Sequence, residues 1–225
     1  MSIFSSLFSK KPSTSPPSIR DTLFGDLPLE QWPVENATQS PWVEFVLARQ
    51  YLAAGQQAQA IVVWQRVLDQ PDLEARHYAQ AWHFLRQHGV QPPTDIAQQL
   101  LGVIVEVGMP EGLDLLAAYP DYSARYYNYS GAGVVWEHPD ESLDEFINRL
   151  LAAAENVVKQ IGPWEEARPA APPTGAVRLN FLTPSGLHFG QGPVDVFSKD
   201  PLAGPVFYSA AQLMNALIEK SSAEK

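Results

Sequence analysis

The chain has 225 residues, 45% hydrophobic and 18% charged, a composition typical of a packed globular protein. Its formal net charge of −10, with no cluster of Lys and Arg in its body, argues against nucleic acid as a partner. The lack of cysteine excludes disulfides, thiolate catalysis and cysteine-ligated zinc, and it suits a reducing, cytoplasmic location. No apolar run reaches the roughly 20 residues that span a bilayer.

The first 40 residues are expected to be largely disordered or extended. Residues 11–18 are rich in Pro and Ser, a composition that cannot bury a core. The order of a signal peptide is missing, because the Lys pair at the end of MSIFSSLFSKK follows the apolar residues. The apolar residues from Ile3 to Phe8 follow helical spacing, so residues 1–11 are either a frayed terminus or a weak anchor for a membrane surface or partner.

Three helices are predicted in the next segment. Pro41 suits the first turn of a helix, and Gly55 suits the end of the same helix. A second helix ends before Pro71, and a third runs from about Leu73 to His88. Each carries an apolar stripe at spacings of three and four residues, which is typical of a helix with one buried face.

Large, small and aromatic residues are regularly spaced along these helices, at Leu47, Ala48, Tyr51, Gly55, Ala60, Trp64, Leu68 and Pro71. This pattern resembles the tetratricopeptide repeat, a helical hairpin of about 34 residues. Gly89 supports a second, partial repeat, but the pattern fails at Pro92 and Pro93. The resemblance covers about residues 41–90, one and a half repeats, whereas at least about three usually make a self-sufficient array.

The resemblance implies a face that grips a partner peptide. Its groove-lining positions fall on Trp42, Phe45 and Arg49. The same face could instead dock on the C-terminal half, which we favour because so short a repeat cannot bury both of its faces alone. Either the face is consumed by this docking or it stays open for a partner.

From residue 102 the hydrophobic pattern changes to that of strands. Four short strands separated by turns are predicted, at residues 103–107, 112–119, 123–129 and 132–137. Such short connections favour antiparallel pairing.

Further helices and strands complete the C-terminal half. A long helix is predicted from Leu143 to Ile161, a strand at 177–182, a short strand at 187–189, and a last helix at about 206–219. The predicted fold class is α+β, with the helical hairpin packed on an antiparallel sheet that carries helices on one face. The predicted regions are 1–40, 41–101 and 102–220.

The residues that could carry catalysis form no familiar motif. His77 and His83 are six residues apart and fall on different helix faces, unlike the two His of a zinc protease. Ser185 lies near His188, but the segment lacks the small-x-Ser-x-small elbow, and turn chemistry explains its residues. No catalytic residue, metal or cofactor is therefore expected.

Six aromatic residues crowd the predicted hairpins, namely Tyr119, Tyr122, Tyr126, Tyr127, Tyr129 and Trp136. Strand alternation sends Tyr126 to one face of the sheet and Tyr127 and Tyr129 to the other. Either the helical region covers that second face, or Tyr127 and Tyr129 bind a partner.

The favoured hypothesis is a non-enzymatic interaction or accessory protein, with an unidentified protein partner. One alternative is a small-ligand binder or enzyme with its site at the seam between the two halves, since seams often hold pockets. Polar residues such as Arg125, Asn128, Glu137 and His188 would serve that site. A second alternative is a peripheral membrane regulator that acts through residues 1–11.

Overall fold

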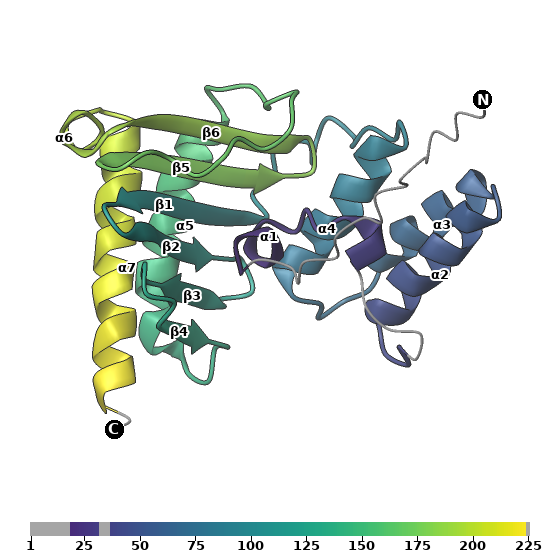
Figure 1. Ribbon diagram of the computed structural model, residues 1–225, viewed down its shortest axis with the longest axis horizontal. Coiled ribbons are helices and arrows are strands. Elements are labelled where there is room, and N and C mark those ends of the chain that lie inside the picture. The colour runs from purple at the N-terminus through teal and green to yellow at the C-terminus, as the bar shows by residue number, and fades with distance from the viewer. Residues whose placement is uncertain (1–18, 32–36, 224–225) are drawn as a thin grey trace, which may run out of the picture.

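The computed structural model of the chain describes residues 19–31 and 37–223 (Figure 1). Six strands form one antiparallel sheet in the order β4-β3-β2-β1-β5-β6. The strands are β1 (Gly102–Met109), β2 (Gly112–Ala118), β3 (Ala124–Tyr127), β4 (Gly133–Trp136), β5 (Ala176–Thr183) and β6 (Gly186–Pro193). The antiparallel sheet and the predicted α+β class are confirmed.

One face of the sheet is covered by two long helices, α5 (Asp144–Val158) and α7 (Ala203–Ala223). The short elements η2 (Glu141–Leu143) and α6 (Val194–Phe197) precede them. Alternate residues of the strands, such as Val103 and Val105, enter this core together with Ile147 and Leu213. The apolar stripes of the predicted helices therefore face the sheet, as period-3.6 patterning requires.

The other face of the sheet packs against the N-terminal helices. These are α1 (Ile19–Phe24), η1 (Leu29–Gln31), α2 (Trp42–Ala53), α3 (Gln57–Leu68) and α4 (Ala75–Gln87). Ile104 and Leu115, which alternate with the residues of the first core, belong to a second core shared with these helices. In Figure 1, α7 lies at the left of the strands and α2 to α4 lie at the right.

Helices α2 and α3 pack against each other. Phe45, Ala48, Ala60 and Trp64 are fully buried where the two helices meet α4. Gly55 has φ +72° in the turn between them, a conformation that favours glycine. The relation of this hairpin to the tetratricopeptide repeat stays a prediction.

Part of the segment that was expected to be largely disordered or extended is helical. Residues 19–24 form α1, whose Leu23 and Phe24 are buried. The Tyr119 hydroxyl donates a hydrogen bond of 2.7 Å to the Leu23 carbonyl. A six-residue helix held by such distant contacts leaves little periodic signal in the sequence. The amphipathic segment 1–11 lies outside the described residues.

The connector between α5 and β5 lies against the sheet. A Cβ atom added to Gly108 of β1 would lie 2.2 Å from the Pro173 carbonyl oxygen, so the two backbones touch at this point. Arg20 and Arg178 both donate to the Pro169 carbonyl, at 2.9 and 3.3 Å. The connector is therefore held at fixed points, although its composition is rich in Pro and Ala.

None of the helices in the described part of the chain has the length and apolar character that a membrane span requires.

Candidate functional site

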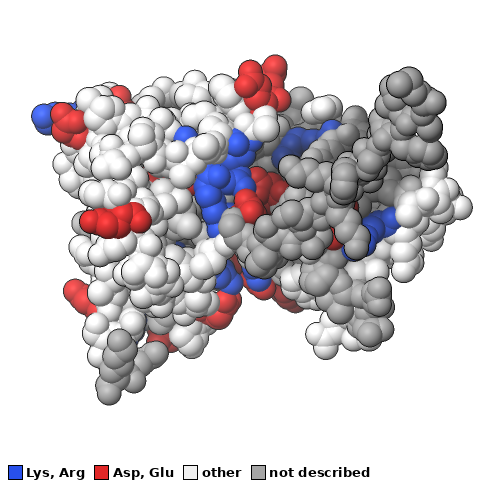
Figure 2. Space-filling model, viewed as in Figure 1, with Lys and Arg blue, Asp and Glu red and all other residues white. Residues whose placement is uncertain are grey.

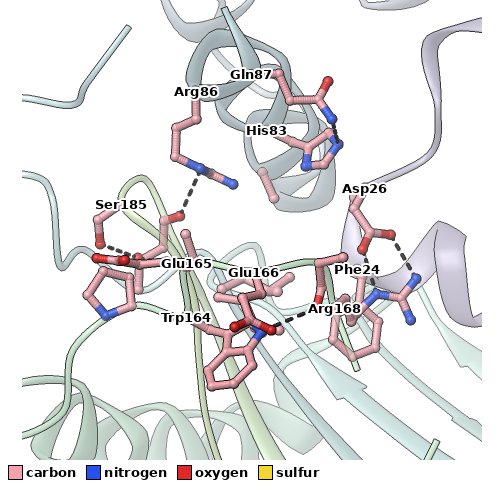
Figure 3. Close-up of a pocket in the computed structure, with 18 of the residues that line it drawn as sticks. Phe24, Asp26, His83, Arg86, Gln87, Trp164, Glu165, Glu166, Arg168 and Ser185 are labelled. Carbon is pink, nitrogen blue, oxygen red and sulfur yellow. Dashed lines mark hydrogen bonds and ion pairs between the residues drawn. The ribbon is translucent and has the colours of Figure 1, made fainter. Parts of the chain in front are cut away.

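A cleft of about 640 Å³ lies at the seam between the two halves. Its walls are α4, the start of the connector at residues 163–168, the β5–β6 turn and the end of α1 (Figure 3). Seams between packed units are common places for ligand sites. The side chains that line this cleft are therefore the first candidates for a functional role.

Helix α4 supplies one wall of the cleft. His83, Arg86 and Gln87 lie at spacings of three and four residues, so they share a helix face. Phe84 and Leu85, between them, are buried in the second core. The packing of α4 thus directs its polar face into the cleft, as Figure 3 shows.

Arg86 is the central charge of this wall. Its guanidinium donates to the carbonyl oxygens of Pro184 at 2.7 Å and Thr183 at 3.5 Å. In the described part of the chain it forms no ion pair with a carboxylate. Burial lowers the pKa of Arg86 to about 10, so it remains a cation at pH 7.

His83 adds a neutral hydrogen-bond donor to the same wall. Its Nε2 lies 3.0 Å from the amide nitrogen of Gln87, which donates to it. The ring proton is therefore on Nδ1. Burial lowers the pKa of His83 to about 4, so the ring is neutral at pH 7.

Arg168 also lines the cleft, but its charge is already compensated. It pairs with Asp21 and Asp26, each at 2.5 Å, and it stacks on Phe24 at 4.3 Å. Further charges tie α1 to the sheet, because fully buried Glu106 binds Arg20 at 2.5 Å and Arg178 at 3.3 Å. Figure 2 shows basic side chains gathered where the halves meet, with acidic side chains beside them.

The connector forms the opposite wall. Trp164 donates its indole N–H to the Ala167 carbonyl at 3.2 Å, and its ring meets the edge of Phe189 at 5.2 Å. Glu165 and Glu166 follow it and are exposed at the cleft. Neither carboxylate forms an ion pair with another described residue.

Ser185 and His188 come together at the β5–β6 turn. His188 Nδ1 lies 3.0 Å from the Ile161 carbonyl and therefore carries the ring proton, which leaves Nε2 to accept from Ser185 Oγ at 3.2 Å. The Thr183 hydroxyl lies 2.9 Å from Ser185 Oγ and donates to the Gly186 carbonyl at 3.0 Å. Burial lowers the pKa of His188. These hydrogen bonds stabilise the turn, whose Thr183 and Pro184 carbonyls accept hydrogen bonds from Arg86.

The partner-binding face predicted on α2 is largely consumed by packing. Phe45 is 0% exposed and meets the edge of Phe84 at 5.8 Å, so of the two alternatives for this residue the structure shows the buried one. Trp42 is half-buried and meets the ring of His77 at 5.4 Å. Arg49 is exposed, and its guanidinium reaches the Glu30 carbonyl at 3.5 Å.

The two predicted tyrosines differ in exposure. Tyr127 packs against the second core, whereas Tyr129 is 49% exposed in the β3–β4 turn. The helical region therefore covers only part of the aromatic cluster. These residues and those of α2 come from separate elements, and none of them lines the seam cleft.

The seam residues predicted from sequence lie mostly away from the cleft. Arg125 pairs with Glu74 at 3.2 Å and with Glu137 at 2.6 Å, while Asn128 caps a turn by accepting from the Ser130 N–H. Only His188 reaches the cleft, through Ser185. Sequence reasoning missed Arg86, because the local sequence does not show that this arginine lacks a carboxylate partner in the folded chain.

The described residues contain no group of three or more His, Asp or Glu placed to hold a metal ion. No family model, curated protein or solved structure matches the chain. A function must therefore be inferred from the side chains of the cleft and their chemistry.

Proposed function

We propose that the protein binds a small anionic ligand in the seam cleft, with Arg86 as the anchoring cation. The observation that carries this proposal is the cation itself. Arg86 is half-buried, points into the cleft and has only backbone carbonyls as partners in the described chain. A guanidinium presents its N–H groups in a planar fork that suits a carboxylate or phosphate.

The surroundings of Arg86 support the same ligand chemistry. The Nδ1–H of His83 is a second donor on the wall, and it stays neutral because its pKa is about 4. The charge of Arg168, in contrast, is already balanced by Asp21 and Asp26. An anion would therefore supply the counter-charge that no described residue gives to Arg86.

Thermal unfolding in the presence of small carboxylates and phosphates tests the proposal. A ligand at about 100 times its Kd stabilises the folded state by about 2.7 kcal/mol, which raises Tm by about 5–10 °C for a chain of this size. We expect at least one such anion to raise the Tm of the wild type and of Arg66→Met, an exposed control on α3.

The ligand-induced shift should vanish in Arg86→Met and shrink in Arg86→Lys, which keeps the charge but loses the planar fork. The shift is compared within each variant, so a lower starting Tm does not affect the result. An equal shift in Arg86→Met and wild type, or no shift with any anion, would contradict the proposal.

The interaction hypothesis stays a prediction beside this proposal. Arg49 and Tyr129 are the predicted partner-binding residues with exposed side chains. The membrane alternative depends on residues 1–11, which lie outside the described part of the chain.

A further inference from the structure

We propose that the ligand of the seam cleft is a zwitterion of the α-amino acid class, which carries an ammonium group as well as a carboxylate. This inference rests on the proposed function and deepens it. It comes from the distribution of charges across the cleft, where an uncompensated cation and uncompensated carboxylates face the same space (Figure 3).

The two walls carry opposite charges. Arg86 enters from α4, and Glu165 and Glu166 belong to the connector on the other side. Although all three line one cleft, neither carboxylate forms an ion pair with Arg86 in the described part of the chain. The charges of the two walls therefore face the same cleft without an ion pair between them.

A ligand with one charge would leave part of this site unfavourable. An anion bound at Arg86 would lie in the field of Glu165 and Glu166, and a cation bound at the glutamates would lie in the field of Arg86. A zwitterion places its carboxylate at Arg86 and its ammonium at the connector. It meets both walls with complementary charge.

The cleft also offers apolar surface for a side chain. Trp164, Phe24, Leu182 and Leu187 contribute to its lining. The face of an indole ring favours both apolar groups and cations. An amino acid with an aromatic or branched aliphatic side chain fits this combination best.

Two matched ligand series test the inference by calorimetric titration. One consists of phenylalanine, 3-phenylpropionate and phenethylamine; the other consists of leucine, 4-methylpentanoate and isoamylamine. In each series the second compound lacks the ammonium and the third lacks the carboxylate. We expect the amino acid of at least one series to bind wild type at least ~10-fold more tightly than either relative, the effect of one charge-assisted hydrogen bond.

The connector is tested with the double variant Glu165→Gln/Glu166→Gln, whose changes are exposed and leave the core intact. It should bind the amino acid at least ~10-fold more weakly. The control Glu111→Gln/Glu219→Gln removes two exposed charges outside the cleft and should bind like wild type.

The outcomes separate this inference from the proposed function. If the carboxylate lacking an ammonium binds as tightly as the amino acid, or if the connector variant binds the amino acid normally, the zwitterion inference is wrong. Arg86-dependent binding of the carboxylate would still uphold the proposed function. If neither amino acid binds wild type, the zwitterion inference is also wrong, and the anion experiment alone decides the proposed function.

Discussion

His77 is the most unusual buried side chain of the helical half. It is 5% exposed, and neither ring nitrogen has a hydrogen-bond partner among the residues that the structure describes. Burial lowers its pKa to about 4, and the nearby cations Arg76 and Arg125 act in the same direction, against Glu74 and Asp121. The ring is therefore neutral in the folded state, and its protonation destabilises that state.

The pH dependence of stability follows from this depressed pKa. The unfolded chain binds a proton near pH 6.5, whereas folded His77 does so only near pH 4. The stabilisation is fully present above pH 6.5 and is lost as the pH falls toward 4. The loss from His77 alone amounts to about 3 kcal/mol in the free energy of unfolding.

His77→Leu should reduce this dependence, because leucine fills a similar volume and cannot be protonated. We expect the variant to lie within about 1 kcal/mol of wild type at pH 7.5, and to lose about 2.5 kcal/mol less than wild type on acidification to pH 4.5. Urea unfolding at both pH values measures the two quantities. Parallel losses in the two proteins would show that His77 is not the source.

At the scale of elements, buried charges attach α1 to the sheet. Glu106 of β1 is 0% exposed and contacts Arg20 of α1, Arg178 of β5 and the amide of Asn180 at 3.2 Å. Because charges of both signs are buried together, the cluster tolerates the loss of one partner poorly.

Glu106→Gln should lower the free energy of unfolding by about 3–5 kcal/mol, because it leaves Arg178 buried with no carboxylate. Arg20→Met should cost less, since Arg20 is partly exposed and Glu106 keeps Arg178 as its partner. Chemical unfolding of the two variants compares these effects. A smaller loss in Glu106→Gln than in Arg20→Met would contradict this description of the cluster.

The connector that forms one wall of the cleft depends on its close approach to β1. Gly108→Ala would place a methyl group 2.2 Å from the Pro173 carbonyl oxygen, so we expect a loss of about 2–3 kcal/mol in the free energy of unfolding. Gly162→Ala is the matched control, since nothing lies within 4 Å of its added Cβ. It should change stability by less than about 0.5 kcal/mol. Equal stability of the two variants in urea unfolding would show that the connector moves freely.

Elements with strong local periodicity could be predicted from sequence, and those held by distant contacts could not. The alternating residues of β1 and β2 and the stripe of α5 match the structure because their patterns are local. Helix α1 has only six residues, and its burial depends on Tyr119 and α4. A segment this short, stabilised by distant contacts, carries no periodic sequence pattern from which a helix could be predicted.

At the scale of the whole molecule, the sheet carries a core on each face, and the helical half shares one of them. In this arrangement Phe45, one of the three residues of α2 predicted to bind a partner, is buried, whereas Arg49 is exposed. The arrangement also created the cleft, whose Arg86 and Glu165 come from elements far apart in the sequence. Docking of the two halves was foreseen, but the residues brought together at the seam depend on how the halves pack.

The most direct test of the central claim is to locate the bound ligand. Trp164 is suited to this because its indole N–H gives a single resonance in a ¹⁵N–¹H spectrum, assigned by its loss in Trp164→Phe. Titration with phenylalanine should shift this resonance and the Nε–H of Arg86 with the same apparent Kd, and should leave the buried indoles of Trp64 and Trp136 unmoved. Shifts confined to other regions, or binding that leaves Trp164 and Arg86 unchanged, would contradict a ligand site in the seam cleft.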